Sequence, residues 1–424
     1  STRFRSQRIA AMVNRAFWIC LWTVLKAESA AFQEDGCPTS ELHFSLENDF
    51  VVSISPPETG EKAFRYDSKW LSAWTRNHTK CLKKVFFRYG VLLFRGFDIQ
   101  DPLAFEEVAL SVVPNLEQAY LGTSPRSQIN GTSYVFTAAD FSPHRTVPVH
   151  IEMSFRDTPP ATQLFYAQQV EQWKGGETPL TDFQAVWEQL SSDPKMHAAF
   201  ASSKMTYLRN LDDCQATSLV DPLVQKCWQK MFKDKEDAQQ KCAEENFICT
   251  WDTSNRLSIT NVQPFIRAHP VTKKKIWYNH INVLHGQMMP NDYTRTASLW
   301  SGIAKLWPMA LSYYYRVLFG IFDLFFKETD MGSTVLKENG EFFTRDELTA
   351  MKAAIHQHTF NHAYRRSDIV MVDNHRIGHG REIYLGPKAS RLIYTAWSDH
   401  YPPSWQDMPE KTCDAVEECS TIAN

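Results

Sequence analysis

The chain has 424 residues, with hydrophobic residues at 43% and charged residues at 22%. This composition is typical of a globular protein and excludes a disordered or low-complexity chain, and the length suffices for one large domain or two. Lys and Arg number 45 and Asp and Glu number 48, which leaves a net charge of −3. No global positive field would draw such a protein onto nucleic acid or anionic lipid, so we expect no polyanion partner and no nucleic-acid partner.

Residues 1–40 differ from the rest of the chain. Arginines without an acid precede the apolar run Ala16–Leu25, and a stretch of small residues follows. This order is typical of a targeting segment, and the alternative is an amphipathic helix packed on the domain. We expect a soluble chain, with targeting to an organelle left open. Nine scattered cysteines without a CxxC pair indicate neither a disulfide framework nor a zinc ribbon.

Hydrophobic periodicity predicts a mixed sequence of strands and helices after residue 41. Because no repeat and no linker rich in Pro, Gly or Ser divides residues 41–424, we expect a single domain there. The expected elements, in chain order, are two short strands over residues 85–97, a helix over 101–113, strands over 147–155 and 162–170, a helix over 183–190, a helix after the capping box Thr344-x-x-Glu347, and strands over 368–372 and 391–397.

The aromatic segment 293–326 is expected to be a long helical insertion, either a lid or a purely structural helix pair. Its apolar stretch from Leu306 to Phe326 contains Pro308, Arg316 and Asp323. Charges within the stretch argue against a membrane span, so we expect no stable one.

The sharpest local feature is His150-Ile-Glu152, in the middle of the expected strand 147–155. Residues two apart on a strand face the same side, so one imidazole and one carboxylate can point at the same ion. The pair alone is a weak signal, because strands with two polar residues on a solvent face are common. It therefore needs a third ligand from elsewhere in the chain.

A second cluster, Asp373-Asn-His-Arg-Ile-Gly-His379-Gly-Arg381, could supply that ligand. Two imidazoles and a carboxylate on one face of a metal leave positions open for a chelating cosubstrate and dioxygen, an arrangement that suits ferrous iron. Arg391 follows inside an apolar strand, where its planar guanidinium could bind both oxygens of a carboxylate. The alternative for Arg391 is an ion pair between strands.

These motifs resemble those of the iron(II)/2-oxoglutarate oxygenases of the taurine dioxygenase and clavaminate synthase superfamily. The resemblance covers roughly residues 85–397 and runs in the family's order. Within the superfamily the motifs are most similar to the SyrP-like branch, which acts on free or carrier-bound amino acids. It is carried by His150-x-Glu152, Asp157-Thr-Pro-Pro-Ala161, Gly175-Gly-Glu-Thr-Pro-Leu180, the 373–381 cluster with Arg391, and the stretches Ser124-Pro-Arg126 and Trp277-Tyr-Asn279.

The resemblance implies an α+β chain with a double-stranded β-helix core, a cupin-like jelly roll, and flanking helices. It implies iron held by His150, Glu152 and His379, and 2-oxoglutarate held by Arg391 with the hydroxyl of Thr178. For Thr178 the alternative is a turn residue after the two glycines. The implied reaction uses dioxygen, converts 2-oxoglutarate to succinate and carbon dioxide, and oxidises a C–H bond by hydroxylation, desaturation or ring closure.

The chain also departs from the family pattern. A second arginine that binds sulfonate in taurine dioxygenase is replaced by Thr395, which disfavours a sulfonate substrate. The loop between Arg381 and Arg391 lacks the branch's usual arginine pair, so its substrate contacts cannot be transferred. Candidate contacts to an amino-acid carboxylate are Arg126, Arg209, Asn279 and Arg381, each of which is otherwise a surface or supporting residue.

Three other functions remain open at this stage. An algal kainoid synthase, which closes a ring on an N-prenylated glutamate derivative, would suit the extra length and the aromatic segment. A non-catalytic jelly-roll binding protein would have no reason to retain all four of His150, Glu152, His379 and Arg391. A zinc hydrolase could use the same three metal ligands, but it has no role for Gly-Gly-Glu-Thr or for Arg391.

Overall fold

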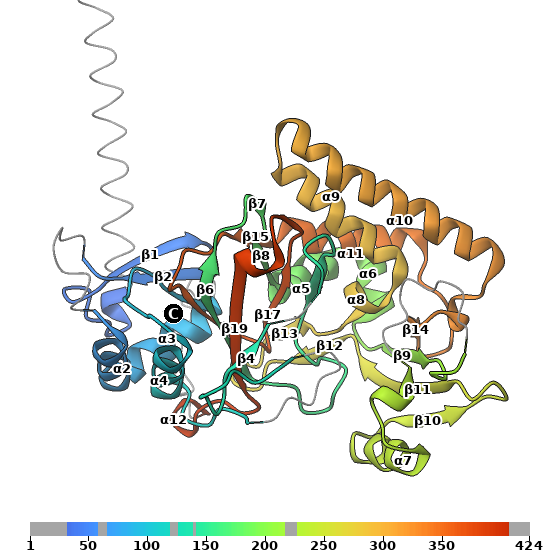
Figure 1. The fold of residues 1–424 in the computed structure, drawn as a ribbon, viewed down its shortest axis with the longest axis horizontal. Helices are drawn as coiled ribbons and strands as arrows, with labels where there is room; N and C mark the ends of the chain where they lie inside the picture. Colours follow the sequence, from blue (N-terminus) through green and yellow to red (C-terminus); the bar gives the residue numbers. More distant parts are fainter. Residues whose placement is uncertain (1–31, 58–65, 119–125, 139–140, 217–226, 407–424) are drawn as a thin grey trace, which may run out of the picture.

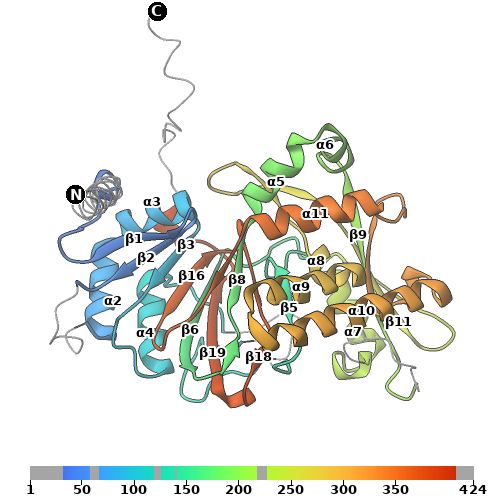
Figure 2. The ribbon, with the colours of Figure 1, turned by 90° about the horizontal axis from the view of Figure 1, so that it is seen from above.

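The computed structural model describes residues 32–57, 66–118, 126–138, 141–216 and 227–406. A seven-stranded sheet in the order β1-β2-β3-β16-β6-β19-β4 lies against a four-stranded sheet in the order β15-β8-β17-β5 (Figures 1 and 2). The bounds of the large sheet are β1 His43–Asn48, β2 Val51–Ser55, β3 Val91–Phe94, β16 Ile369–Asp373, β6 Thr162–Val170, β19 Arg391–Ser398 and β4 Phe136–Thr137. Those of the small sheet are β15 Thr359–His362, β8 Thr178–Asp182, β17 Ile377–Arg381 and β5 Val147–His150.

One apolar cluster fills the space between the two sheets. Phe165, Val370 and Ile393 from the large sheet are buried in it with Leu180 and Ile377 from the small one. The β2–β3 pair is parallel, and the other pairs of both sheets are antiparallel. Burial of this shared layer therefore fixes how β8 and β17, which carry the predicted site residues Thr178, His379 and Arg381, face β6 and β19.

A second cluster packs helices on the outer face of the large sheet. It includes Leu71, Phe86 and Phe105 from three successive helices, together with Trp405. The helices lie at the N-terminal side of the molecule, beside β1, β2 and β3 (Figure 1). They are α2 Ser68–Asn77, α3 Thr79–Tyr89, α4 Pro102–Val112 and the short α12 Pro403–Gln406.

The opposite side of the molecule is built by helices and a further sheet. A third cluster joins α5 (Phe183–Ser192), α6 (Pro194–Phe200), α8 (Ile281–Leu284) and α11 (Arg345–Gln357). The further sheet has the order β10-β11-β9-β14, with α7 (Lys235–Glu244) beside it. Remaining strands are β10 Ile248–Trp251, β11 Leu257–Pro264, β9 Lys204–Leu211, β14 Ser333–Lys337, and the pairs β12 Ile266–Ala268 with β13 Lys275–Trp277 and β7 Lys174–Gly175 with β18 Tyr384–Leu385.

The segment 293–326 forms most of a helix pair, α9 (Met289–Leu299) and α10 (Leu306–Phe325). A buried ion cluster ties α9 to the residue after β17. The guanidinium of Arg295 donates to Glu382 at 2.7 Å and to Asp292 at 2.6 Å, and all three side chains are at most 2% exposed. Because one buried charge is satisfied by two others, the pair is held firmly to the end of the strand that carries His379.

Most of the predicted elements are confirmed. The helices over 101–113, 183–190 and after Thr344 are α4, α5 and α11, and Thr344 and Glu347 do form the reciprocal capping box. The strands over 162–170, 368–372 and 391–397 are β6, β16 and β19.

Two strand predictions are wrong in part. Residues 85–89 belong to α3, which ends at Gly90 with φ of 99°, and only Val91–Phe94 is a strand. The apolar residues of α3 recur at helical spacing on its buried side, a pattern hidden by the adjoining strand. In the other case β5 ends at His150, so Glu152 lies in the turn that follows rather than on the strand.

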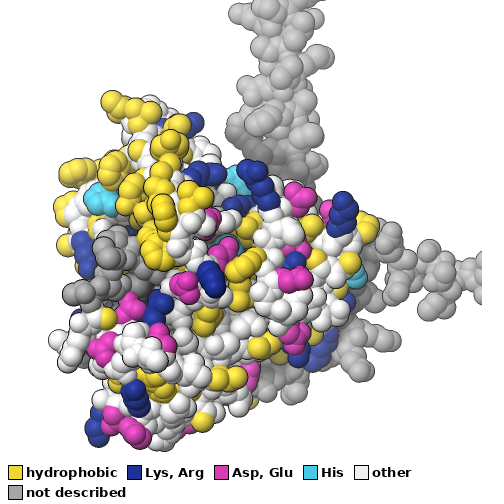
Figure 3. Space-filling model, turned by 90° about the vertical axis from the view of Figure 1, so that its right-hand side faces the viewer, with side chains coloured by type: hydrophobic (Ala, Val, Ile, Leu, Met, Phe, Trp, Pro, Cys, Tyr) yellow, Lys and Arg dark blue, Asp and Glu magenta, His cyan; other side chains and the backbone are white. Residues whose placement is uncertain are grey.

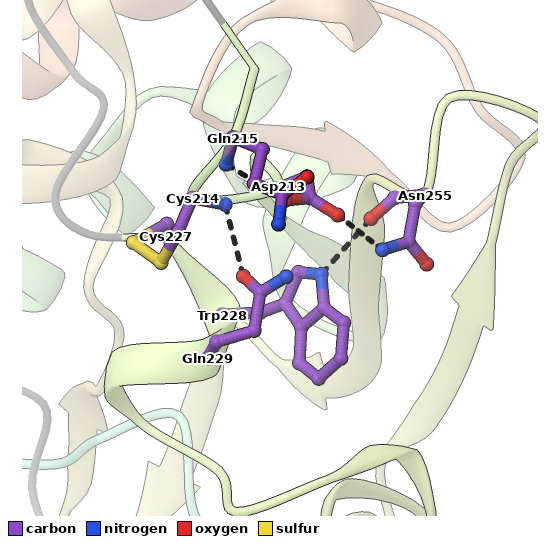
Figure 4. Close-up of a disulfide and its surroundings, with 7 residues drawn as sticks. All are labelled: Asp213, Cys214, Gln215, Cys227, Trp228, Gln229 and Asn255. Carbon is purple, nitrogen blue, oxygen red and sulfur yellow. Dashed lines mark hydrogen bonds between the residues drawn. A yellow bond between two sulfur atoms is a disulfide. The ribbon is translucent and has the colours of Figure 1, made fainter.

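The absence of a disulfide framework is also a wrong prediction. Disulfides join Cys37 to Cys81, Cys214 to Cys227, and Cys242 to Cys249. Figure 4 shows the second of these beside a hydrogen-bonded turn, in which the side chain of Gln229 accepts from the backbone N–H of Cys214 at 3.0 Å. Spacing along the sequence gave no sign of the pairs, because tertiary packing brings the partners together. Residues 1–31 of the predicted targeting or amphipathic segment 1–40 lie outside the described residues, whereas Phe32 and Cys37 are buried in the core of the domain.

We predict that replacing both Cys37 and Cys81 with Ala lowers the free energy of unfolding by roughly 2–4 kcal/mol. The bond closes a loop of 44 residues in sequence separation and links the segment before β1 to α3, so its loss enlarges the unfolded ensemble. Urea denaturation of the double variant and of the wild type measures the difference. An unchanged midpoint would show that these cysteines are not paired in the folded protein.

Candidate metal centre and active site

His379 occupies the middle of β17, between β5 and β8. Its Cα lies opposite those of His150 on one side and Leu180 on the other. Residues paired across antiparallel strands present their side chains on the same face. The backbone pairing therefore places the two imidazoles side by side, with their ring centroids 4.7 Å apart.

Glycines flank His379 because the other face of β17 is crowded. A Cβ at position 378 would lie 2.1 Å from the ring of Phe183, and one at position 380 would lie 2.5 Å from the carbonyl oxygen of Val147. Both distances are far below van der Waals contact. Gly378 and Gly380 thus allow β17 to approach α5 and β5 closely enough to bring His379 to its place.

Glu152 lies in the turn after β5, and the side chain of Asn374 holds its backbone. The side chain of Asn374 accepts from the Glu152 N–H at 2.9 Å and donates to the Glu152 carbonyl at 3.1 Å. It also donates to the carbonyl of Pro160 at 2.7 Å. Met153 turns the chain with a φ of 52°, a conformation rare outside glycine. One buried amide therefore fixes the direction of the carboxylate.

The three predicted ligands converge. The Nε2 atoms of His150 and His379 each lie 3.6 Å from Oε2 of Glu152, and one ligand atom from each residue lies within 4.8 Å of the others. The Nδ1 of His150 lies 2.8 Å from the carbonyl oxygen of Pro148. Since a carbonyl only accepts, Nδ1 carries the proton and Nε2 offers its lone pair to the common point.

Electrostatics set the protonation states that a metal requires. Burial alone would raise the pKa of Glu152, but the charge of Arg126, whose guanidinium lies 2.8 Å from its carboxylate, holds it well below its ordinary value. Burial lowers the pKa of His379 to about 4. At neutral pH the Glu152 carboxylate is therefore ionised and the His379 imidazole is neutral, the forms that bind a divalent cation.

The donor set fits ferrous iron. Two imidazoles and one carboxylate on one side of an ion, with the remaining positions open, form the facial arrangement of non-haem iron oxygenases. The Nδ1 of His379 is buried without a hydrogen-bond partner among the described residues. The ring contacts Phe165 instead, at a centroid distance of 4.9 Å, so packing from the large sheet orients it.

Arg391 and Thr178 form a second polar centre. Arg391 donates to the carbonyl of Gly176 at 2.8 Å and to the hydroxyl of Thr178 at 3.3 Å. No carboxylate among the described residues forms an ion pair with this guanidinium. Burial lowers the pKa of Arg391. Thr178 lies on β8 two residues from Leu180, the partner of His379, hence on the same face and about 7 Å along the strand. The guanidinium of Arg391, which has no ion-pair partner among the described residues, therefore contacts β8 two residues from the position that pairs with His379.

The other candidate contacts have different surroundings. The guanidinium of Arg126 lies 2.8 Å from Oε2 of Glu152 and over the ring of Trp397; Ser124 and Pro125 lie outside the described residues. Arg381 donates to the carbonyls of Phe141, Ser142 and Arg145, so these donors hold a loop and do not point to a substrate. Asn279 accepts from the N–H of Ile281, and its buried Nδ2 has no described partner.

Arg209 is the least explained of these cations. Its guanidinium lies 4.9 Å from the ring centroid of Phe155 and 5.5 Å from that of Phe247. The side chain is 9% exposed, and no described residue forms a hydrogen bond or an ion pair with the guanidinium. Burial lowers its pKa to about 10, with Glu245 opposing, so it stays charged at neutral pH.

His280 connects Arg209 to the metal ligands. Its ring lies 5.1 Å from that of His150 and 5.5 Å from that of Phe155. Burial and the neighbouring His150 lower its pKa to about 3, so it is neutral. Sequence reasoning missed both His280 and Asn374. The first follows Asn279 directly and the second lies within the 373–381 cluster, but only their contacts distinguish them from other polar residues.

A mixed α/β fold with a His-Glu-His centre and a buried arginine defines an iron- and 2-oxoglutarate-dependent dioxygenase. The family model for "Taurine catabolism dioxygenase TauD, TfdA family" matches residues 56–397. The chain belongs to this family, and its cofactors are Fe(II), 2-oxoglutarate and dioxygen.

Two curated relatives are similar to the chain. The dapdiamide synthesis protein DdaC of Enterobacter agglomerans is 25% identical over 332 residues, which cover 77% of this chain and 88% of that protein. A clavaminate synthase-like protein of Arabidopsis thaliana is 25% identical over 237 residues, which cover 54% and 69%. The crystal structure of PvcB from Pseudomonas aeruginosa aligns over 84% of this chain and 91% of that one, with 14% identity and a TM-score of 0.43.

Within the part of the chain that the structure describes, no helix is both long and apolar enough to cross a membrane. Helix α10 has 20 residues, but Arg316 and Asp323 interrupt its apolar sequence.

We predict that Asn374→Ala weakens iron binding about 10- to 100-fold, because residues that orient a metal ligand typically contribute that much. The change removes the bonds that fix the Glu152 backbone while leaving all three ligands in place. Anaerobic titration of the apoprotein with Fe(II) gives the affinity.

Asn115→Ala is the matched control, since this amide also donates to the side chain of Ser398 and the carbonyl of His400 but contacts none of the three ligands. Circular dichroism tests whether both variants fold. Equal iron affinity in the two variants would mean that Asn374 does not position Glu152.

Proposed function

We propose that the protein oxidises a C–H bond of an amino acid or an amino-acid-derived small molecule, coupled to decarboxylation of 2-oxoglutarate. The observation that carries this proposal is the convergence of His150, Glu152 and His379 on one point, together with the partly buried guanidinium of Arg391, which contacts Thr178 on the neighbouring strand and lacks a carboxylate partner among the described residues. A carrier-bound amino acid is one form that the substrate could take.

His150, Glu152 and His379 would hold the iron, with Arg391 and Thr178 on the far carboxylate of 2-oxoglutarate. Bound iron with this cosubstrate and dioxygen supplies the oxidising power for an unactivated C–H bond and yields succinate and carbon dioxide. The chain contributes position and polarity. The Nε2 atoms of His150 and His379 converge with the Glu152 carboxylate, Arg126 keeps Glu152 ionised, and Arg391 offers a planar fork that suits a carboxylate.

Arg209 supports an amino-acid substrate. A charged guanidinium buried between two phenyl rings, with no carboxylate partner among the described residues, leaves a desolvated cation that an incoming carboxylate would satisfy. Ring contacts through Phe155 and His280 lead from Arg209 to His150. Asn279 precedes His280 and offers its unpaired Nδ2 as a further donor. Thr395 is buried and accepts from Gln163 at 3.1 Å, so the position offers no cation for a sulfonate.

We also propose that the seven-stranded and four-stranded sheets form the double-stranded β-helix, or jelly roll, within one domain over residues 41–424, with 293–326 as an insertion. The antiparallel pairing of both sheets and their shared apolar layer support this assignment. The SyrP-like branch is proposed on the sequence motifs, and DdaC, named for the synthesis of dapdiamide, is in keeping with an amino-acid-derived substrate.

We further propose that the chain folds in an oxidising compartment, reached through a targeting segment in residues 1–40. Three disulfides among the described residues support this, because such bonds persist where thiols are not kept reduced.

A second candidate is oxidative ring closure of an N-prenylated glutamate derivative, as in kainoid synthases. The phenyl rings of Phe155 and Phe247 on either side of Arg209 favour it, because a substrate with both a carboxylate and an apolar chain would use both. Hydroxylation adds an oxygen atom to the substrate, whereas desaturation or ring closure removes two hydrogens. Mass spectrometry of the product separates these outcomes.

Reconstitution tests the proposed activity. We expect the protein, loaded anaerobically with Fe(II) and 2-oxoglutarate, to form succinate when oxygen is admitted, and to form more with an amino-acid substrate. His379→Ala should lose iron binding and turnover, because it removes one of three ligands. Succinate formation absent under all conditions would favour a binding protein, and activity with Zn(II) but not Fe(II) would favour a hydrolase.

Two arginine variants separate cosubstrate from substrate. We expect Arg391→Ala to raise the KM for 2-oxoglutarate about ten- to a hundredfold, because a charge-assisted contact is lost, with little change in the KM for the substrate. Arg209→Ala should do the reverse, so each variant is the control for the other. An unchanged 2-oxoglutarate requirement in Arg391→Ala would place the cosubstrate elsewhere.

A further inference from the structure

Helix α10 presents an unusually apolar outer face. Residues of α10 and its flanks that are more than two-fifths exposed include Ile303 at 86%, Leu324 at 79%, Phe325 at 75% and Tyr313 at 70%. The set continues with Leu306, Trp307, Met309, Tyr314, Val317, Ile321 and Phe326. Figure 3 looks at this side of the molecule and shows apolar side chains gathered in its upper part, where the α9–α10 pair lies. We call this set the α10 face.

Helical geometry makes the face continuous. At 3.6 residues per turn, Tyr313, Val317, Ile321 and Leu324 fall on one side of α10. The opposite side packs on α9 through Ser312 and Phe319 and their neighbours. An amphipathic helix normally turns its apolar side to the core and its charges to water. Here the charges are absent from the outer face, which points to an apolar partner there.

The two charges of α10 lie at one edge of the face, where a basic groove begins. A cavity of about 680 Å³ lies between α9, α10 and α11, and its lining includes Arg316, Arg345, Lys352, His356 and Asp323. None of the three cations Arg316, Arg345 and Lys352 forms an ion pair with any described residue, whereas Asp323 accepts from Gln287. Lys327 follows α10 and Lys305 precedes it. The apolar face is therefore bordered by cations.

We propose that the α10 face is a membrane-docking surface, which lies in the interface of an anionic phospholipid bilayer with lipid headgroups against the basic groove. Helix α10 is not long and apolar enough to cross a membrane. A helix that lies in the membrane interface needs only one apolar face. Trp307, Tyr313 and Tyr314 are the residue types enriched at headgroup depth. Cations beside an apolar face match the negative surface of such a bilayer.

A second copy of the chain is the main competing occupant, and the charges disfavour it. Pairing of two α10 helices across a twofold axis would bring the three cations of each groove toward those of the other copy, with Asp323 as the one acid in each lining. The proposal does not depend on the oxygenase activity, since none of the residues of the α10 face contacts the three metal ligands.

Hydrogen–deuterium exchange on the full-length, iron-loaded protein tests the proposal at the helix itself. We expect vesicles of phosphatidylcholine and phosphatidylserine to slow exchange in peptides that cover residues 303–327, and vesicles of phosphatidylcholine alone to do so less. Unchanged exchange in these peptides would overturn the proposal, even if another part of the chain carried the protein onto the vesicles.

Variants measure the contribution of each feature in vesicle co-sedimentation. Ile321→Glu combined with Leu324→Glu should lower vesicle binding at least tenfold, whereas Leu103→Glu combined with Ile248→Glu, two equally exposed apolar positions elsewhere, should not. Arg345→Gln with Lys352→Gln should reduce the preference for anionic vesicles about tenfold or more. Equal binding by the first variant and its control would refute the proposal, as would a wild-type dimer in light scattering that the first variant abolishes without any vesicle binding.

Discussion

The pairing of β17 between β5 and β8 is the constraint on which the rest of the site depends. It sets His379 opposite both His150 and Leu180, and it is possible only because Gly378 and Gly380 carry no side chain on the crowded face. From this one register follow the distance between the two imidazoles and the step along β8 to Thr178. A one-residue slip would turn His379 to the opposite face and dissolve the site.

Both burial and direct contacts determine the charges of the side chains in the site. Arg126 and the imidazoles of His150 and His379 surround one ionised carboxylate, while Arg391 and Arg209 have no carboxylate partner among the described residues. Buried cations of this kind are costly unless a ligand completes them. Other buried arginines beside the site are satisfied within the protein. Arg381 donates to the loop around Phe141, and Arg295 donates to Glu382 at the end of β17.

The α9–α10 pair links the end of β17 on its inner side to the α10 face on its outer side. Its inner side is fastened through the Arg295 cluster to the end of the strand that carries His379, and through Tyr293, whose hydroxyl accepts from the Thr146 N–H at 3.4 Å, to the residue before β5. Its outer side is apolar and bordered by cations. Docking at that face would hold the helix pair, and with it the end of β17, against the bilayer surface.

The sequence by itself determined the residue types and the order of the motifs: it named His150-x-Glu152, Thr178, His379 and Arg391 as candidates, because iron ligation and carboxylate binding restrict which side chains can serve. It also determined most strands and helices, whose periodicity is local. Only the tertiary structure decided that Glu152 lies in a turn held by Asn374, that Arg381 holds a loop while Arg209 stays unpaired, and that six cysteines pair. Each of these depends on contacts between segments distant in sequence, which no local pattern encodes.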